Sequence, residues 1–204
     1  MVSQGESLQP NQNKAEILRA ATALFVEQGM TGLNVRAVAT RAGVSTIGVY
    51  SHFGGKAGLL DALYADGFAQ LGQVVAAANH ATDPHDAIMN AVDRYVAFST
   101  TNAAHYALMF DSGSAGYQPG AAARAVARSA FGQLARTVSR VATADLGRDG
   151  SSAMAFSLWA LVHGYVTLRA HASIDGVSDA DWLGLVRSAA QTLLAGARQQ
   201  GVAS

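Results

Sequence analysis

Apolar residues recur along the chain with the spacing of α-helices, and turn-forming residues separate the segments that carry this pattern. Over residues 12–28, apolar side chains fall at i, i+1, i+4, i+7 and i+8 counted from Ile17, and Gly29 follows as a stop. Two short helices are expected at residues 35–41 and from Ser45 to about residue 53, and a long helix from Lys56 to about Ala78. The first 55 residues therefore predict three helices and the start of a fourth.

The two short segments carry residues that start and stop helices. Asn34 and Ser45 are suitable N-caps, because their side chains can accept a hydrogen bond from the first turn. Val44, just before Ser45, can act as a hydrophobic staple. Gly43 can adopt the left-handed conformation that closes the first short helix. The spacing predicts two helices joined by a tight turn.

The remainder of the chain continues the helical pattern. Helices are expected at residues 84–101, 103–110, 121–144, 151–171 and 179–198, with residues 111–120 as the main loop. No alternating strand pattern persists for four positions. The chain is therefore expected to be all-α. We divide it into a disordered arm (1–11), a helix-turn-helix domain (12–58) and a helical domain for effector binding and dimerisation (59–204).

Composition narrows the possible functions. The chain has 204 residues and no Cys, which excludes disulfide scaffolds, thiol catalysis and Cys-ligated metal sites. The polar N-terminus lacks the apolar segment of a secretory signal. Residues 150–168 carry no formal charge, but their Ser, His, Thr and Gly residues favour a buried helix over a membrane span. A cytoplasmic protein without a membrane partner is expected.

The two short helices suggest a chemistry. Two helices joined by a short Gly-containing turn form the helix-turn-helix, whose second helix enters the major groove of DNA. Tyr50 and His52 could donate to phosphate oxygens, and Lys56 lies in the first turn of a helix whose N-terminus also favours an anion. Taken singly, Tyr50 could close a small core, His52 could be a surface residue and Lys56 a solvated cation. Their combination favours DNA binding.

Residues 31–60, TGLNVRAVATRAGVSTIGVYSHFGGKAGLL, together with the preceding ILRAATALFVEQG, resemble the tetracycline-repressor (TetR) family of transcription regulators. The resemblance implies base-edge contacts from Arg36, Thr46, Ile47 and Gly48, and phosphate contacts from Tyr50, His52 and Lys56. Ser45, at the start of the second short helix, belongs to the same expected DNA-binding set. The sequence departs from the family pattern at Ile47, where Gly is common, at Gly48, where Thr is common, and at Ser51, which is often basic.

A second resemblance lies near the C-terminus. WALVHG, residues 159–164, resembles the Trp-x-x-x-His-Gly signature of one subgroup of that family. Family architecture implies a ligand cavity among these helices, although each candidate could equally be a core residue. The candidate ligand-binding residues are Tyr95, Phe98, His105, Tyr106, Met109, Phe110, Phe156, Trp159 and His163.

No enzyme or metal motif accompanies these patterns. Lys56 follows Gly55, but a phosphate-binding P-loop would need Gly at Tyr50 and Ser or Thr at Ala57. His80, Asp83, His85 and Asp86 are close in sequence without a recognised ligand spacing, and Asp83 is more simply an N-cap. We therefore predict neither catalysis nor a cofactor.

The function predicted is a ligand-responsive repressor that binds a near-palindromic operator in double-stranded DNA as a homodimer and is released by a small, mainly apolar effector. The alternative is an all-α carrier or enzyme whose N-terminal domain no longer binds DNA. The dimer contact is expected on the last two helices, through Leu158, Leu161, Tyr165 and Leu168 on one and Leu185, Val186, Ala189, Leu193 and Gly196 on the other. No charged residue occurs in residues 95–110 or 150–168, which favours a neutral effector with His105 and His163 as polar anchors.

Overall fold

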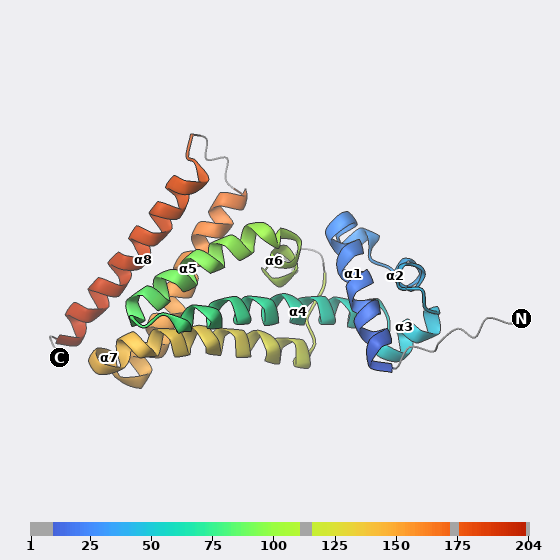
Figure 1. Ribbon diagram of the computed structural model, residues 1–204, viewed down its shortest axis with the longest axis horizontal. Helices are drawn as coiled ribbons and strands as arrows, with labels where there is room; N and C mark the ends of the chain where they lie inside the picture. Colours follow the sequence, from blue (N-terminus) through green and yellow to red (C-terminus); the bar gives the residue numbers. More distant parts are fainter. Residues whose placement is uncertain (1–9, 111–115, 172–175, 203–204) are drawn as a thin grey trace, which may run out of the picture. The chain divides into compact units, whose positions relative to one another are not determined.

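The computed structural model describes residues 10–110, 116–171 and 176–202, and within these residues all regular structure is helical (Figure 1). The helices are α1 (Pro10–Gly32), α2 (Val35–Ala42), α3 (Thr46–Phe53), α4 (Lys56–Ala77), the short 3₁₀ helix η1 (Ala78–His80), α5 (Pro84–Thr101), α6 (Ala103–Phe110), α7 (Ala121–His171) and α8 (Asp179–Val202). The predicted all-α fold is confirmed. Most of the predicted N-terminal arm (residues 1–9) and half of the predicted loop (residues 111–115) lie outside the described residues.

The described residues form two compact units. Unit 1 comprises the chain up to Gly67 together with Ala104–Ala125, and unit 2 comprises Phe68–Ala103 together with the chain from Val126 onward. Helix α6 is therefore grouped with the N-terminal helices although it follows α5 in the sequence. Each unit is described by itself below.

Unit 1 is built around the apolar face that the sequence predicted on α1. Ile17 and Ala21 of α1, Val38 of α2, Val49 of α3 and Leu63 of α4 are fully buried. Helix α1 changes direction at Gly29, whose φ of 64° lies in the left-handed region that a residue with a Cβ rarely adopts. The predicted stop at this glycine is thus a kink, after which the helix runs on to Gly32.

Unit 2 has a separate core of aliphatic side chains. Ile88 of α5, Val138 and Leu158 of α7, and Val186 of α8 are fully or almost fully buried. Helix α5 begins as predicted, because the Asp83 side chain accepts hydrogen bonds from the backbone N–H groups of His85 and Asp86. Helix α8 is tied to α5 by an ion pair between Arg187 and Asp93.

Helix α7 differs from the prediction of two helices at residues 121–144 and 151–171, because helical backbone continues from Ala121 to His171. No proline interrupts the intervening sequence, so nothing removes a backbone donor there. Even so, α7 folds back on itself, as Figure 1 shows in yellow and orange. The ring centroids of Phe131 and Trp159 lie 5.7 Å apart, whereas 28 residues of straight helix would separate them by about 42 Å. The helical assignment is therefore continuous, but the helix axis reverses between the two predicted segments, and the two arms pack against each other.

Candidate DNA-binding surface and effector site

The helix-turn-helix is fixed by the local residues that the sequence singled out. The Asn34 side chain accepts a hydrogen bond from the N–H of Ala37 at 2.9 Å, and the Ser45 hydroxyl accepts one from the N–H of Gly48 at 3.1 Å. Gly43 ends α2 with φ of 67°, a conformation that glycine adopts without steric cost. These interactions set where α3 starts, and hence which side chains it exposes.

Helix α3 buries one side and exposes the other. Val49 is fully buried, whereas Ile47 is 79% and Tyr50 58% exposed. Thr46 and Ser51 are also exposed, so these four residues share one helix face at the spacing i, i+1, i+4 and i+5. Ser51 was not among the predicted contacts, although its position four residues after Ile47 was a signal for it.

The other predicted DNA-binding residues lie beside this face or at its start. Arg36 in the first turn of α2 and Ser45 before α3 are exposed, and Gly48 and His52 are partly exposed. The Tyr50 ring packs over Gly55, where an added Cβ would lie 3.0 Å from Tyr50 Cε1. Gly55 has φ of 110° and so favours glycine for its conformation as well. This contact orients the tyrosine along the end of α3.

Several cations of unit 1 already have partners within it. Lys56 donates from Nζ to the carbonyl of Met30 at 2.9 Å, which links the start of α4 to the end of α1. The ammonium of Lys14, a residue that sequence reasoning missed, lies 5.9 Å from the centre of the Phe53 ring. This is within reach of a cation–π interaction. Lys14 therefore adds an exposed cation next to the end of α3.

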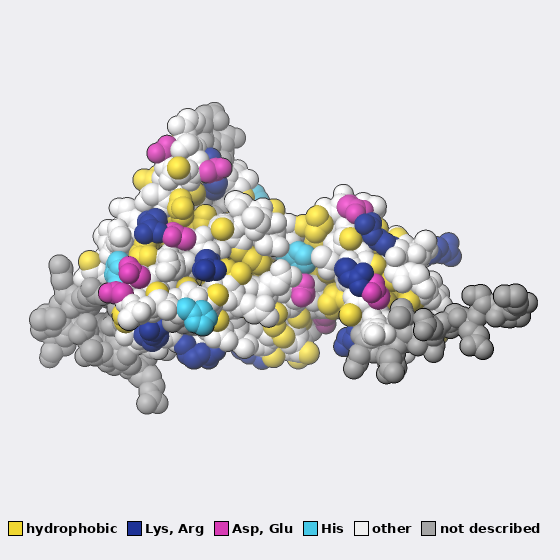
Figure 2. All heavy atoms as spheres, viewed as in Figure 1, with side chains coloured by type: hydrophobic (Ala, Val, Ile, Leu, Met, Phe, Trp, Pro, Cys, Tyr) yellow, Lys and Arg dark blue, Asp and Glu magenta, His cyan; other side chains and the backbone are white. Residues whose placement is uncertain are grey.

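Arg41 forms a bidentate pair with Glu27 of α1, with both distances at 2.6 Å. This hydrogen bond lowers the pKa of the Glu27 carboxyl and raises that of Arg41. On the face shown in Figure 2, some cationic side chains in dark blue have anionic ones in magenta beside them, whereas others, such as those along the lower edge, do not.

The candidate ligand-binding residues fall into both units. Tyr95, Phe98, Phe156, Trp159 and His163 lie in unit 2, whereas His105, Tyr106, Met109 and Phe110 lie in unit 1. Phe98 is a core residue of α5 that is 3% exposed. The structure therefore does not bring the nine residues together within one unit.

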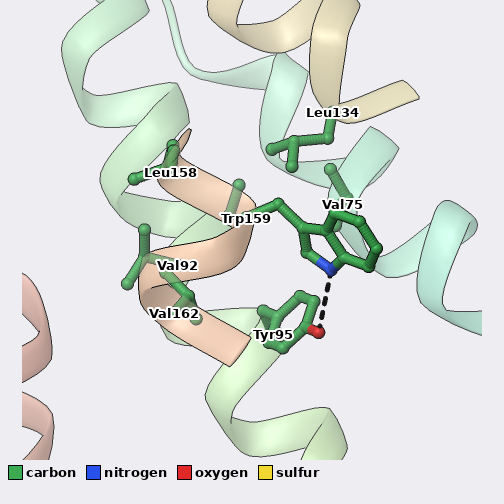
Figure 3. A pocket seen from close by; sticks show the side chains of 8 residues that line it. Val75, Val92, Tyr95, Leu134, Leu158, Trp159 and Val162 are labelled. Carbon is green, nitrogen blue, oxygen red and sulfur yellow. Dashed lines mark hydrogen bonds between the residues drawn. The ribbon is translucent and has the colours of Figure 1, made fainter. Parts of the chain in front are cut away.

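In unit 2, Trp159 and Tyr95 close a small apolar cavity (Figure 3). Trp159 Nε1 donates to the Tyr95 hydroxyl at 3.2 Å. The remaining walls are Val75, Ala91, Val92, Leu134, Leu158 and Val162. The cavity has a volume of about 10 Å³, close to the room for one water molecule. It is much smaller than ordinary ligand pockets, which occupy about 300–1,000 Å³, so side chains fill it in this structure.

On its other side, Trp159 joins an aromatic cluster. Its indole lies 5.8 Å from the ring of Phe156 and 6.2 Å from that of His163, and Phe131 contacts both Trp159 and Phe156. Phe156 is 58% exposed and Trp159 is partly exposed. His163 lies 3.5 Å from the hydroxyl of Thr167 on the same helix. Trp159 therefore separates an aliphatic cavity from a solvent-facing aromatic surface.

In unit 1, His105 occupies a different environment. It is 4% exposed, packs edge-on against Phe25 of α1, and its Nε2 lies 3.9 Å from a carboxylate oxygen of Asp66. Nε2 is buried without a hydrogen-bond partner. Burial lowers the pKa of His105, and the Asp66 carboxylate raises it in part. Met109 packs next to His105 against Gly67, where an added Cβ would lie 2.8 Å from the methionine sulfur.

Sequence reasoning also missed a contact between α4 and the segment before α7. Asp61 accepts hydrogen bonds from the Tyr117 hydroxyl at 2.6 Å and from the N–H of Gly120 at 2.9 Å. Burial raises the pKa of Tyr117, and the hydrogen bond to Asp61 adds to this. Because 56 residues separate Tyr117 from Asp61, no local sequence pattern could have indicated their contact.

The helices α7 and α8 form an apolar groove on unit 2. Its walls are Leu161, Tyr165, Leu185, Ser188, Ala189, Thr192 and Leu193. Leu168 and Leu185 are 54% and 49% exposed. Leu158 and Val186, which were expected at a dimer contact, are instead buried in the core of unit 2, because they lie on the inward faces of these helices.

Neither a membrane span nor a metal-binding cluster is found among the residues that the structure describes. None of the helices there has the length and hydrophobicity that a membrane crossing requires. Nor do three or more His, Asp or Glu side chains gather there in a way that could hold a metal ion.

A helix-turn-helix with a solvent-facing second helix, followed by a larger helical unit, is typical of DNA-binding transcription regulators. Residues 17–63 match the family of bacterial regulatory proteins of the tetR type, and residues 88–193 match the tetracyclin repressor-like C-terminal domain. The second match alone covers more than half of the chain. The chain belongs to the TetR family of DNA-binding transcription regulators and is therefore a regulator rather than an enzyme.

Solved structures resemble the chain over most of its length. A protein of unknown function from Rhodococcus sp. RHA1 is 25% identical, with a TM-score of 0.78 over 95% of this chain and 98% of the other. A TetR-family transcriptional regulator from Streptomyces coelicolor is 22% identical, with a TM-score of 0.66 over 91% and 99%. The TetR-family regulator PfmR from Thermus thermophilus is 18% identical, with a TM-score of 0.61 over 88% and 97%. Among curated proteins, no sequence matches the chain.

Proposed function

We propose that the protein is a homodimeric repressor in the cytoplasm that binds a near-palindromic operator and is released by a small apolar effector. The observation that carries this proposal is the exposed face of α3, where Ile47 and Tyr50 project away from a buried Val49. Because Ile47 is 79% exposed, its side chain does not pack in the core of unit 1, but it can contact thymine methyl groups in a major groove.

Within this proposal, Arg36, Thr46, Ile47 and Gly48 read base edges, whereas Tyr50, His52 and Lys56 bind phosphates. Arg36 and Thr46 are exposed and carry the donors and acceptors that base edges need. Lys56 has three donors, of which the bond to Met30 uses one. Ser45 contributes by starting α3, and Ser51 joins the contact set because it lies on the same face as Ile47.

The test is a titration of the protein with duplex DNA from the region upstream of its own gene, repeated over a range of salt concentrations. Replacement of Lys56 by Ala should weaken binding to all sequences and flatten the slope of log K against log salt by roughly 0.9. Replacement of Arg36 by Ala should instead change the preference among sequences. If Lys56→Ala leaves affinity and slope unchanged, this arrangement on DNA is wrong.

The dimer is proposed to form through the groove between α7 and α8. Leu161, Tyr165, Leu185 and Leu193 give each chain an apolar surface, and a two-fold contact between such surfaces makes a four-helix bundle. Light scattering should give twice the mass of one chain at micromolar concentration. Leu185→Glu should give a folded monomer, and a dimer that survives this change would place the contact elsewhere.

The effector is proposed to be neutral because no charged side chain lines the cavity in unit 2. The segment of residues 159–164 supports an assignment to the subgroup with the Trp-x-x-x-His-Gly signature. Release of DNA by a neutral apolar compound, and not by an anionic compound of similar size, would support this. Release by charged compounds alone would contradict it.

A further inference from the structure

We propose that Trp159 is a displaceable lid over an effector site, and that this site takes a neutral, mainly aliphatic molecule carrying one hydroxyl or carbonyl group. The inference rests on the proposed effector response and adds to it where the ligand binds, how the site opens and what chemistry it selects.

The first observation is the composition of the cavity beneath Trp159 (Figure 3). Val75, Val92, Leu134 and Val162 present only hydrocarbon, and no charged side chain lines the space. Burying an ionised group among such side chains without a partner is prohibitively costly. A ligand that enters this cavity must therefore be uncharged.

The second observation is the small free volume of the cavity. About 10 Å³ is free, so no organic ligand fits unless a side chain moves. The aliphatic walls come from α4, α5 and both arms of α7, and most of them are deeply buried. Trp159 is partly exposed, so it is the large wall residue that can leave with the least loss of packing. Its departure would open a space of about the size of an indole ring.

The third observation concerns what holds the lid and where it can go. A hydrogen bond of 3.2 Å joins Trp159 Nε1 to the Tyr95 hydroxyl, and such a neutral bond on a partly exposed group contributes modestly. On the outer side, Phe156 is exposed and Phe131 and His163 already contact the indole. The rotated ring would therefore keep aromatic neighbours.

The Tyr95 hydroxyl sets the polar requirement of the ligand. It is the polar atom that Trp159 contacts at the edge of the cavity (Figure 3). When the indole leaves, a ligand hydroxyl or carbonyl can replace Nε1 as the partner of this oxygen, because a tyrosine hydroxyl both donates and accepts. A pure hydrocarbon would leave the hydroxyl without that partner and bind less tightly.

The experiment uses the fluorescence of Trp159 in the full chain. Trp182 is the second of two Trp residues, and Trp182→Phe leaves Trp159 as the single reporter. The probes are n-heptanol and, as a charged counterpart of equal chain length, heptanoate. Heptanol should shift Trp159 emission to longer wavelength by several nanometres and increase its quenching by acrylamide, and heptanoate should do neither. The proposal would be wrong if calorimetry detects heptanol binding while Trp159 emission stays unchanged. It would also be wrong if heptanoate binds as tightly as heptanol.

Two variants separate a lid from a purely structural tryptophan. Trp159→Ala should bind n-heptanol about tenfold more tightly, because no side chain has to be displaced. Weaker binding by this variant, with its helical circular dichroism intact, would contradict the proposal. Tyr95→Phe keeps the fold but removes the hydrogen bond, so Trp159 should be more accessible to acrylamide even without ligand and heptanol should bind more weakly. Unchanged quenching and unchanged affinity in Tyr95→Phe would also overturn it.

The same samples, titrated with the upstream DNA, distinguish this inference from the proposed function. If heptanol moves Trp159 but leaves DNA affinity unchanged, the site stands and the effector role fails. If an apolar compound releases DNA while Trp159 stays in place, the effector role stands and the lid fails.

Discussion

In the helix-turn-helix, each short helix begins with a side chain that binds its own first turn, and α2 ends at a glycine in the left-handed conformation. In unit 2, α7 is held by contacts between residues far apart in the sequence, such as Phe131 with Trp159. Local hydrogen bonds fix a backbone in one geometry. Side-chain packing between helices fixes a volume, which can be filled in more than one way.

This difference suits the two tasks proposed for the chain. A surface that reads base edges needs side chains held to within about 0.5 Å, and the caps of α2 and α3 fix the backbone that carries them. A site that must open needs a wall residue that can move, and Trp159 has a neutral hydrogen bond to Tyr95 and a partly exposed ring. The predictions below test whether unit 2 responds to changes of volume and unit 1 to changes of local geometry.

The largest effect is expected in the core of unit 2. Leu158 is 1% exposed, and its replacement by Ala should lower the free energy of unfolding by about 2–5 kcal/mol, because a cavity remains. The control is Val26→Ala in unit 1, where Val26 is exposed and the change should stay within about 0.5 kcal/mol. Urea denaturation followed by circular dichroism measures both. Equal effects would mean that Leu158 does not hold the core together.

A smaller effect is expected where α3 meets α4 in unit 1. An added Cβ at Gly58 would clash with the backbone carbonyl of Phe53. Gly58→Ala should therefore lower stability by about 1–3 kcal/mol, although alanine favours helix. The matched control is Gly132→Ala in α7, where the nearest group is the end of the Arg136 side chain at 3.6 Å. That change should raise stability by roughly 0.5–1 kcal/mol. Stabilisation by both would show that α3 and α4 can separate without cost.

The helices that follow local sequence patterns were the ones that the sequence could predict. The caps at Asn34 and Ser45, the turn at Gly43 and the apolar face of α1 are local patterns, so the order and approximate bounds of most helices followed from them. The unbroken helical assignment through residues 145–150 did not follow from them, because the Asp and Gly residues there suggested two separate helices. Periodicity reports which positions are apolar, but not how a helix bends.

The candidate sites show the same limit. The exposed face of α3 follows from helical spacing once Val49 is placed inside. The pairing of Lys56 with Met30, of Asp61 with Tyr117, and of Trp159 with Tyr95 joins residues 26, 56 and 64 positions apart. No local pattern carries such contacts. For the same reason His105, expected with His163 as a polar anchor of the effector, is grouped with unit 1 whereas His163 is in unit 2.

The caps of the helix-turn-helix give a test of intermediate size. Ser45→Ala removes the acceptor for the N–H of Gly48 and should cost about 0.5–2 kcal/mol of stability. Ser51→Ala, on the exposed face of the same helix, should change stability by less than about 0.5 kcal/mol. Thermal denaturation of both variants makes the comparison. If Ser51→Ala lowers stability as much as Ser45→Ala does, the hydrogen bond from Gly48 to Ser45 is not what stabilises the start of α3.

The smallest effect concerns pH and the buried His105 of unit 1. Burial lowers its pKa in the folded chain, while Asp66, 3.9 Å away, offsets part of that effect. The unfolded chain therefore binds a proton more readily than the folded one below about pH 6.5. The stability contributed by the neutral imidazole is complete above this pH and is lost as the pH falls through the unfolded and then the folded pKa. Urea midpoints at pH 8 and pH 5.5 should differ more for the parent chain than for His105→Leu, which cannot titrate. Because the other five His residues remain in both chains, subtracting one difference from the other isolates His105. An equal or larger pH dependence in the variant would show that His105 accepts a proton without cost, and that Asp66 outweighs its burial.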